Sequence, residues 1–141
     1  MVFGMGTRLA WGGLGTNISA VLASPEVQEV VPVWRFWNDW GIRDAQMIGW
    51  WQEDVPVTAS DPLVKATAYV KPDLSMLIAV GNFGANATTV TLTFKDGKAR
   101  KLSARAIEAY QPAREFDVGV GSDITNVPVQ AKGGWLLERA A

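Results

Sequence analysis

Tryptophan offers the most obvious binding chemistry in this chain of 141 residues. An indole face stacks well on the apolar face of a sugar ring, so clustered tryptophans are typical of carbohydrate-binding surfaces. The adjacent pair Trp50-Trp51 is the most informative. Successive side chains of a strand point to opposite faces, so the two indoles cannot both enter one core. One of them must be exposed, lie at an interface or be covered by a helical segment.

This pair and its neighbours are the predicted ligand-binding residues, and the expected ligand is a carbohydrate. The predicted set is Trp40, Trp50, Trp51, Gln52 and Glu53, with Asn82 as a further hydrogen-bonding candidate. A hydrogen bond to a sugar hydroxyl replaces one to water and contributes only about 1 kcal/mol. We therefore expect weak binding.

Paired carboxylates are the remaining route to glycosidase chemistry. A retaining enzyme needs two carboxyl groups about 5–5.5 Å apart, and an inverting enzyme needs about 6.5–9.5 Å. Glu53 and Asp54 are the best placed, with Asp39 and Asp44 before them. Adjacent acids in a Gln-Glu-Asp-Val-Pro turn are more typical of a solvated loop. We predict no catalytic residue, and a small autonomous glycosidase that uses these carboxylates stays an alternative.

The chain has no cysteine and no histidine. This composition excludes thiolate nucleophiles, disulfides, Cys/His zinc sites and imidazole acid–base catalysis. Oxygen ligands for calcium are available at Asn82, Asn86, Asp96 and Asp123. Their spacing matches no calcium-binding loop, and the preference of these residue types for turns explains each of them. We therefore predict no metal site and no cofactor.

The charge balance is close to neutral, with 13 basic and 14 acidic side chains. No basic stripe is present, so nucleic acid is not an expected partner. No segment reaches the roughly 18 consecutive apolar residues of a membrane span, and no membrane partner is expected. The opening segment MVFGMGTRLAWGGLG lacks the long apolar core of a signal peptide, and the compartment stays unknown.

Helical signals are concentrated in the first third of the chain. Ser24-Pro25-Glu26 is a start signal, and Pro32 restarts or kinks the helical segment. The spacing predicts a helix over Val30–Trp40 that ends at Gly41. Its apolar positions recur at i, i+3, i+4 and i+7, namely Val33, Phe36, Trp37 and Trp40. Most of the helix tryptophans are therefore expected to pack against a core.

From Gln46 onward the apolar period changes from 3.6 to 2 residues. This pattern, with turn residues between short segments, predicts a mainly β fold: a β-sandwich of about seven to eight antiparallel strands. Asp96-Gly97 is the strongest hairpin dipeptide. We expect residues 1–45 to form a tryptophan-rich helical lead-in that packs on a sandwich of residues 46–141. The predicted strands are Gln46–Trp51, Leu63–Val70, Met76–Phe83, Thr88–Lys95, Lys101–Tyr110, Glu115–Val118, Asn126–Gln130 and Gly134–Glu138.

Five phrases of the sequence carry a family resemblance: FGMGTRLAW, VWRFWNDWGIRDAQMIGWWQEDVPV, VKATAYV, IEAYQPAREF and KGGWLLE. Together they resemble the C-terminal region of uncharacterised bacterial glycoside-hydrolase-like proteins that are distantly related to glycoside hydrolase family 123. In that family a catalytic-type barrel is followed by a β-sandwich. The resemblance implies that Met1–Gly15 corresponds to the end of the barrel and Val55–Ala141 to the sandwich.

The resemblance implies an accessory role, because the barrel that would supply the acid–base chemistry is absent from this chain. We expect a non-catalytic module of a carbohydrate-active protein that binds glycan weakly through exposed tryptophan. The alternative is a purely structural module. Its partner would be the missing barrel, or a second copy of the chain joined through the tryptophan-rich N-terminal segment.

Overall fold

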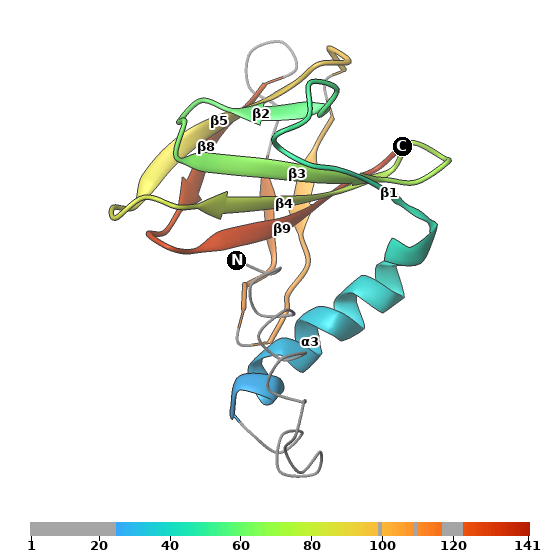
Figure 1. Cartoon of the computed structure of the whole chain (residues 1–141), viewed down its shortest axis with the longest axis vertical. Helices are drawn as coiled ribbons and strands as arrows, with labels where there is room; N and C mark the ends of the chain where they lie inside the picture. The colour runs from blue at the N-terminus through green and yellow to red at the C-terminus, as the bar shows by residue number, and fades with distance from the viewer. Residues whose placement is uncertain (1–24, 99, 109, 117–122) are drawn as a thin grey trace.

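The computed structural model describes residues 25–98, 100–108, 110–116 and 123–141 (Figure 1). The barrel-like segment Met1–Gly15 and the start signal at Ser24 lie outside the described residues. The part of the predicted strand Glu115–Val118 beyond Phe116 also lies outside them.

The described residues include one α-helix, α3, which covers Pro25–Trp40. It begins at the predicted start signal, since proline suits the first helical position, where its missing N–H would be unpaired anyway. The predicted helix Val30–Trp40 is therefore right but short, and Pro32 does not interrupt it. Gly41 ends the helix with a φ of 86°, and its N–H donates to the carbonyls of Trp37 and Asn38, both at 3.1 Å. A short 3₁₀ helix, η1 (Ile42–Asp44), comes next in the chain.

In the part of the chain that the structure describes, nine strands form two antiparallel sheets, so the predicted mainly β fold is confirmed. The six-stranded sheet has the order β1-β3-β4-β9-β6-β7, and the three-stranded sheet has the order β2-β5-β8. The strands are β1 (Gln46–Ile48), β2 (Val57–Ala59), β3 (Val64–Val70), β4 (Met76–Asn82), β5 (Thr88–Phe94), β6 (Leu102–Ala104), β7 (Arg114–Phe116), β8 (Ile124–Val129) and β9 (Gly134–Arg139).

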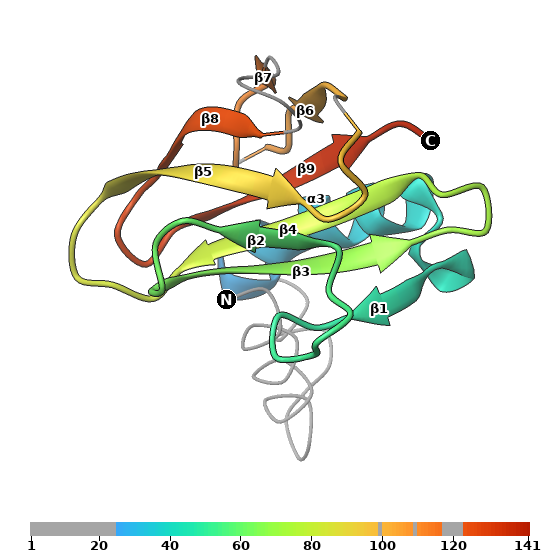
Figure 2. The same cartoon turned by 90° about the horizontal axis from the view of Figure 1, so that it is seen from above.

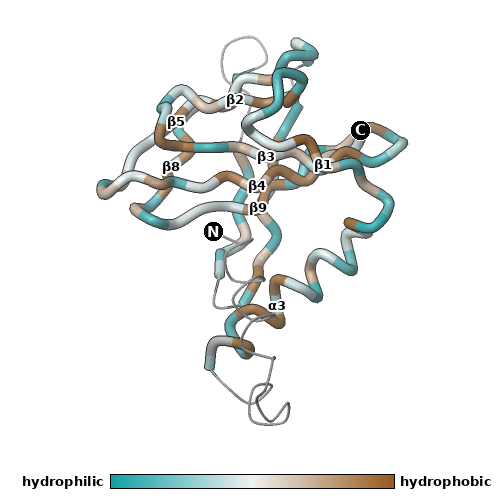
Figure 3. Tube along the Cα trace, in the orientation of Figure 1, coloured by the Kyte–Doolittle hydropathy of each residue, from teal (hydrophilic) through white to brown (hydrophobic). Residues whose placement is uncertain are grey.

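The elements stack in three layers, with the small sheet on one side of the large sheet and α3 on the other (Figure 2). Alternation along the strands sends successive side chains to the two faces of the large sheet. Its inner face includes Ala68, Ile78 and Leu137, which pack against Leu92 of β5 and Ile124 of β8 in the sandwich core. All five side chains are fully buried. Hydrophobic segments run through β4, β9 and α3 (Figure 3).

The outer face of the large sheet packs against α3. The contacting side chains come from the helix, from β3, β4 and β9, and from the loop after β6; they are Val33, Phe36, Trp40, Tyr69, Leu77, Ile107 and Leu136. The predicted apolar face of the helix is therefore confirmed at three of its four positions, and Trp37 is only half-buried.

Two strand predictions require correction, and one strand was missed. The predicted strand Gln46–Trp51 ends at Ile48, and Trp50 and Trp51 lie in a turn. Of the predicted strand Lys101–Tyr110 only Leu102–Ala104 is strand. The short strand β2 was not predicted, because three residues are too few to display a period.

The Asp96-Gly97 turn also differs from its prediction as a hairpin. Gly97 adopts a φ of 66°, as the dipeptide suggests. However, β5 before it pairs with β2 and β8, whereas β6 after it pairs with β7 and β9. The turn thus carries the chain from one sheet to the other, since sheet membership depends on long-range pairing and not on the turn.

Candidate functional site

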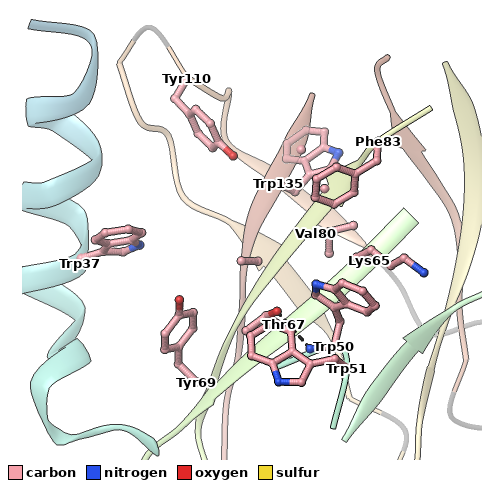
Figure 4. Close-up of a pocket in the computed structure, with 13 residues that line it drawn as sticks. Trp37, Trp50, Trp51, Lys65, Thr67, Tyr69, Val80, Phe83, Tyr110 and Trp135 are labelled. Atoms are coloured by element: carbon pink, nitrogen blue, oxygen red, sulfur yellow. Dashed lines mark hydrogen bonds between the residues drawn. The ribbon is translucent and has the colours of Figure 1, made fainter. Parts of the chain in front are cut away.

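A hollow lies on the outer face of the large sheet, beside α3 (Figure 4). Its floor consists of small residues that face one another across three strands. Thr67 of β3 is opposite Ala79 of β4, and Gly81 of β4 is opposite Gly134 of β9. Thr67 is buried and Ala79 packs against the edge of the helix–sheet cluster, while Gly81 and Gly134 are partly exposed. We call this site the aromatic hollow; its full lining is Trp37, Trp50, Trp51, Lys65, Thr67, Tyr69, Ala79, Val80, Gly81, Phe83, Tyr110, Gly134 and Trp135.

Glycine is required in the floor at position 134. A Cβ atom there would lie 2.1 Å from the carbonyl oxygen of Val80 and 3.3 Å from the Cα atom of Gly81. Backbone atoms cannot move away as a flexible side chain could, so a larger residue would disrupt the pairing of β4 with β9. Because the two strands approach closely at this pair of glycines, no side chain rises from the floor there.

The loop after β1 places Trp50 and Trp51 at the mouth of the hollow. Gly49 and Gln52 close a turn, because the Gln52 N–H donates to the Gly49 carbonyl at 2.9 Å and the Gly49 N–H donates to Gln52 Oε1 at 2.6 Å. The Trp50 N–H donates to Thr67 Oγ1 at 3.3 Å and ties the loop to β3. The side-chain ring of Trp51 lies over Gly49, where a Cβ atom would be 2.5 Å from it.

Both indoles are exposed to solvent. Trp50 is 45% exposed and Trp51 is 59% exposed. Their rings meet edge to face at 90°, with centroids 5.7 Å apart. Of the three alternatives that the sequence left open for this pair, exposure is the one observed, and it applies to both indoles. The predicted reason was wrong, because a turn, and not the alternation of a strand, directs both rings outward.

Three polar groups line the opposite side of the hollow. Trp37 from α3, Tyr69 from β3 and Tyr110 point toward one gap between helix and sheet (Figure 4). The indole Nε1 of Trp37 is buried and has no hydrogen-bond partner among the described residues. Burial raises the pKa of Tyr69 to about 12, and it raises the pKa of Tyr110 to about 12 as well. Both phenols therefore keep their protons near neutral pH.

The side chain of Gln111 positions Tyr110. Its Nε2 donates to the carbonyls of Arg105, at 2.8 Å, and Leu136, at 3.0 Å. Its Oε1 accepts the N–H of Leu136 at 2.8 Å. The carboxamide thus pairs with β9 as a neighbouring strand would, and it fixes the loop from which Tyr110 reaches over the hollow.

One charged side chain, Lys65, belongs to the described lining of the hollow. Its Nζ lies 4.6 Å from the ring centroid of Trp50, within the range of a cation–π contact. The four carboxylates considered from the sequence are exposed and do not line the hollow; they are Asp39, Asp44, Glu53 and Asp54. The arrangement of the described residues therefore suits binding better than acid–base chemistry.

Of the five predicted ligand-binding residues, two lie at the hollow and three do not. Trp50 and Trp51 line the hollow, while the Gln52 side chain closes its turn. Glu53 is exposed and does not line the hollow, and its backbone carbonyl accepts a hydrogen bond from Lys95 Nζ at 2.5 Å. Trp40 is 7% exposed in the helix–sheet layer, with Lys71 Nζ 4.2 Å from its ring centroid. Its burial follows from its helix position, which directs it to the sheet.

Asn82 does not face the hollow either. Its carboxamide is buried, donates to the carbonyls of Asn86 and Val129, and accepts the Gly84 N–H at 2.8 Å. No described group of acidic residues is arranged to hold a metal ion. Within the described part of the chain, no helix has the length and apolar character needed to cross a membrane.

Sequence reasoning missed most of the residues that complete the hollow. These are Trp37, Lys65, Thr67, Tyr69, Phe83 and Tyr110. A usable signal existed on β3, where Lys65, Thr67 and Tyr69 alternate with apolar residues and therefore share one face. Phe83 and Tyr110 carried no such signal, since each lies outside a regular strand.

A search of curated proteins finds no match to this chain. The family model described as Glycoside hydrolase 123, C-terminal domain, matches residues 9–139. The match covers nearly the whole chain and agrees with the resemblance found in the sequence. The chain belongs to the family of glycoside hydrolase 123 C-terminal domains.

Proposed function

We propose that this domain is a non-catalytic accessory module of a glycoside-hydrolase-like protein and binds carbohydrate in the aromatic hollow. The observation that carries the proposal is the pair of exposed indoles, Trp50 and Trp51, at the mouth of a hollow with a bare floor. Exposed tryptophan is unusual unless a partner covers it, and sugar rings fit such faces. The phenol groups of Tyr69 and Tyr110 can bind hydroxyls on the far side.

The expected affinity is low. Each aromatic contact adds about 0.5–1.5 kcal/mol beyond the burial of area, and each hydrogen bond adds about 1 kcal/mol. After the cost of association this corresponds to about −4 kcal/mol, a dissociation constant near 1 mM. An accessory module with such an affinity raises the local concentration of substrate without holding it for long.

Calorimetric titration with a panel of neutral and acidic oligosaccharides tests the proposal. At least one glycan should bind at millimolar concentration, and Trp50→Ala should abolish the binding while the fold is kept. Leu63→Ala is the matched control, because Leu63 is also apolar and 55% exposed but does not line the hollow. Absence of heat across the panel, or equal affinity of Trp50→Ala and the parent, would contradict the proposal.

A second candidate is a structural or oligomerising module, favoured by the amount of exposed apolar side chain. Besides the two indoles, Met47, Leu63 and Phe83 are 39%, 55% and 54% exposed. Such surface is covered by a partner in many proteins, here a barrel of the larger protein or a second copy of this chain. Light scattering at high concentration distinguishes the two: a dimer that Trp51→Glu dissociates supports this candidate, and a monodisperse monomer counts against self-association.

A further inference from the structure

Every polar side chain in the described lining of the aromatic hollow can donate a hydrogen bond, and none of them can only accept one. Thr67 Oγ1 already accepts the Trp50 N–H, so its hydroxyl hydrogen is left to donate. The indole N–H of Trp37 can only donate. The phenols of Tyr69 and Tyr110 are protonated near neutral pH, as phenols ordinarily are, so each has one hydrogen to donate. No carboxylate belongs to the described lining of the hollow.

The one charged side chain in the described lining, Lys65, is also a hydrogen-bond donor. Lys65 carries an ammonium group with three donors, and no described carboxylate lies within ion-pair distance of it. Its Nζ lies over the ring of Trp50, 4.6 Å from the ring centroid. A ring stacked on Trp50 would therefore lie beside a fixed positive charge. The chain as a whole carries a net charge of −1, so this attraction for anions is local.

The distance along β3 separates the charged Lys65 from Tyr69, one of the neutral donors. Lys65 and Tyr69 lie on the same face of β3, four residues apart, which corresponds to roughly 13 Å along a strand. Lys65 and Thr67 lie next to Trp50, and the other neutral donors, on Trp37, Tyr69 and Tyr110, lie on the side of α3 (Figure 4). A single sugar ring cannot reach both ends, but a chain of two or more rings can.

We propose that the aromatic hollow selects acidic oligosaccharides, with an anionic group of one sugar ring bound to Lys65 and the adjoining ring held by the neutral donors near Trp37. This inference rests on the proposed function and names the class of glycan. A carboxylate or a sulfate ester supplies only acceptors, which complements a hollow of donors. A charge-assisted hydrogen bond in a partly desolvated site is also stronger than a neutral one.

The test compares oligogalacturonide with its fully methyl-esterified form, in titrations of the complete chain. The two probes share their rings and linkages and differ only in the charge and the methyl ester that removes it. The acid should bind about tenfold tighter than the ester at low salt. Raising the NaCl concentration from about 50 mM to about 500 mM should remove most of that preference, because the charge pair lies near the surface. A sulfated galactan oligosaccharide of equal length then shows whether a sulfate ester replaces the carboxylate.

Two lysine variants form a matched pair. Lys65→Met keeps an apolar stem over Trp50 and removes the charge, so its affinity for the acid should fall to that for the ester. Lys71→Met removes a similar ammonium, 4.2 Å from the ring centroid of Trp40, outside the hollow, and should keep the tenfold preference. Lys65→Arg should keep it as well.

The outcomes separate this inference from the proposed function. Equal binding of acid and ester, lost in Trp50→Ala, overturns the selectivity and leaves the sugar site in place. An equal loss of preference in Lys65→Met and Lys71→Met also overturns it. Absence of binding by any of these probes overturns the selectivity, and only absence of heat across the whole panel of neutral and acidic glycans contradicts both proposals. Because the comparison of acid with ester needs no substitution, the inference stays testable even if a variant fails to fold.

Discussion

The two faces of the large sheet use the same central strands but are covered in different ways. On the inner face Ala68, Ile78 and Leu137 are fully buried against a second sheet. On the outer face one helix covers Tyr69 and Leu136, and the floor around Gly81 stays open. A seven-residue strand is roughly 23 Å long, whereas a helix with its side chains is about 10–12 Å wide. A helix that runs obliquely to the strands leaves part of the face uncovered (Figure 1).

Because of this difference, we expect the inner face to stabilise the fold and the uncovered part of the outer face to bind a ligand. A sheet closed by another sheet excludes water over its whole length, so its side chains stabilise the fold. The uncovered part of the outer face contributes little burial, and its aromatic residues are available to a ligand. Substitutions on the two faces should therefore differ in the property that they change.

The largest loss of stability is expected on the inner face. Leu137→Ala removes a fully buried side chain and leaves a cavity in the sandwich core, which should lower the free energy of unfolding by about 3–5 kcal/mol. Urea denaturation measures the loss. Leu63→Ala, at a side chain that is 55% exposed, should change it by less than about 0.5 kcal/mol. Similar losses in the two variants would refute the contrast.

Substitutions in the helix–sheet layer should lower the free energy of unfolding slightly less than Leu137→Ala does. Two adjacent residues of α3 allow a direct comparison. Phe36 is 5% exposed, and Phe36→Ala should cost about 3 kcal/mol. Trp37→Phe keeps an aromatic ring and removes a buried N–H that has no described partner, so we expect a change of less than about 1 kcal/mol. Thermal unfolding of the two variants checks the order; a larger loss in Trp37→Phe would show that the indole N–H is paired.

A charge pair at the edge of the sandwich makes the stability depend on pH. Burial by itself raises the pKa of Asp96, but hydrogen bonds from the Lys98 N–H and from Arg139, with the charge of Arg139, outweigh it and lower that pKa below its ordinary value. Arg139 is 3% exposed and reaches the carboxylate at 2.8 Å.

Because the pKa of Asp96 is lower in the folded state, the pair stabilises the fold above the ordinary carboxyl pKa. This contribution is lost as the pH falls through the folded value. Asp96→Asn should lower the free energy of unfolding at pH 7 by about 1–2 kcal/mol, since the carboxylate is partly exposed and screened. It should also flatten the dependence of stability on pH in the acid range. A variant that keeps the full acid dependence of the parent would contradict this assignment.

The smallest effect on stability is expected at the mouth of the hollow. Trp50→Ala and Trp51→Ala should each change the free energy of unfolding by less than about 0.5–1 kcal/mol, because both rings are largely solvated. Their effect on glycan affinity should be large by comparison. The melting temperature and the glycan affinity of each variant, measured in parallel, test this prediction. A sharp fall in melting temperature would place these indoles in the core.

Much of the fold follows from local pattern. The i, i+3, i+7 spacing of Val33, Phe36 and Trp40 requires a buried helix face, and Gly41 supplies the left-handed residue that ends it. The alternation along β3 and β5 requires strands with one face in a core. These features depend on residues that are close in the sequence, and therefore the sequence alone determined them.

The aromatic hollow could not be predicted from local pattern, because its residues come from segments that are far apart in the sequence. The exposure of Trp50 and Trp51 depends on a turn that ends β1 early, and the half-burial of Trp37 depends on where α3 lies across the sheet. Tyr110 reaches the hollow because Gln111 pairs with Leu136, 25 residues away. The sequence by itself determined the side-chain chemistry. The convergence of these groups on one bare floor was decided by the tertiary packing, since contacts between segments far apart in the chain leave no local period to read.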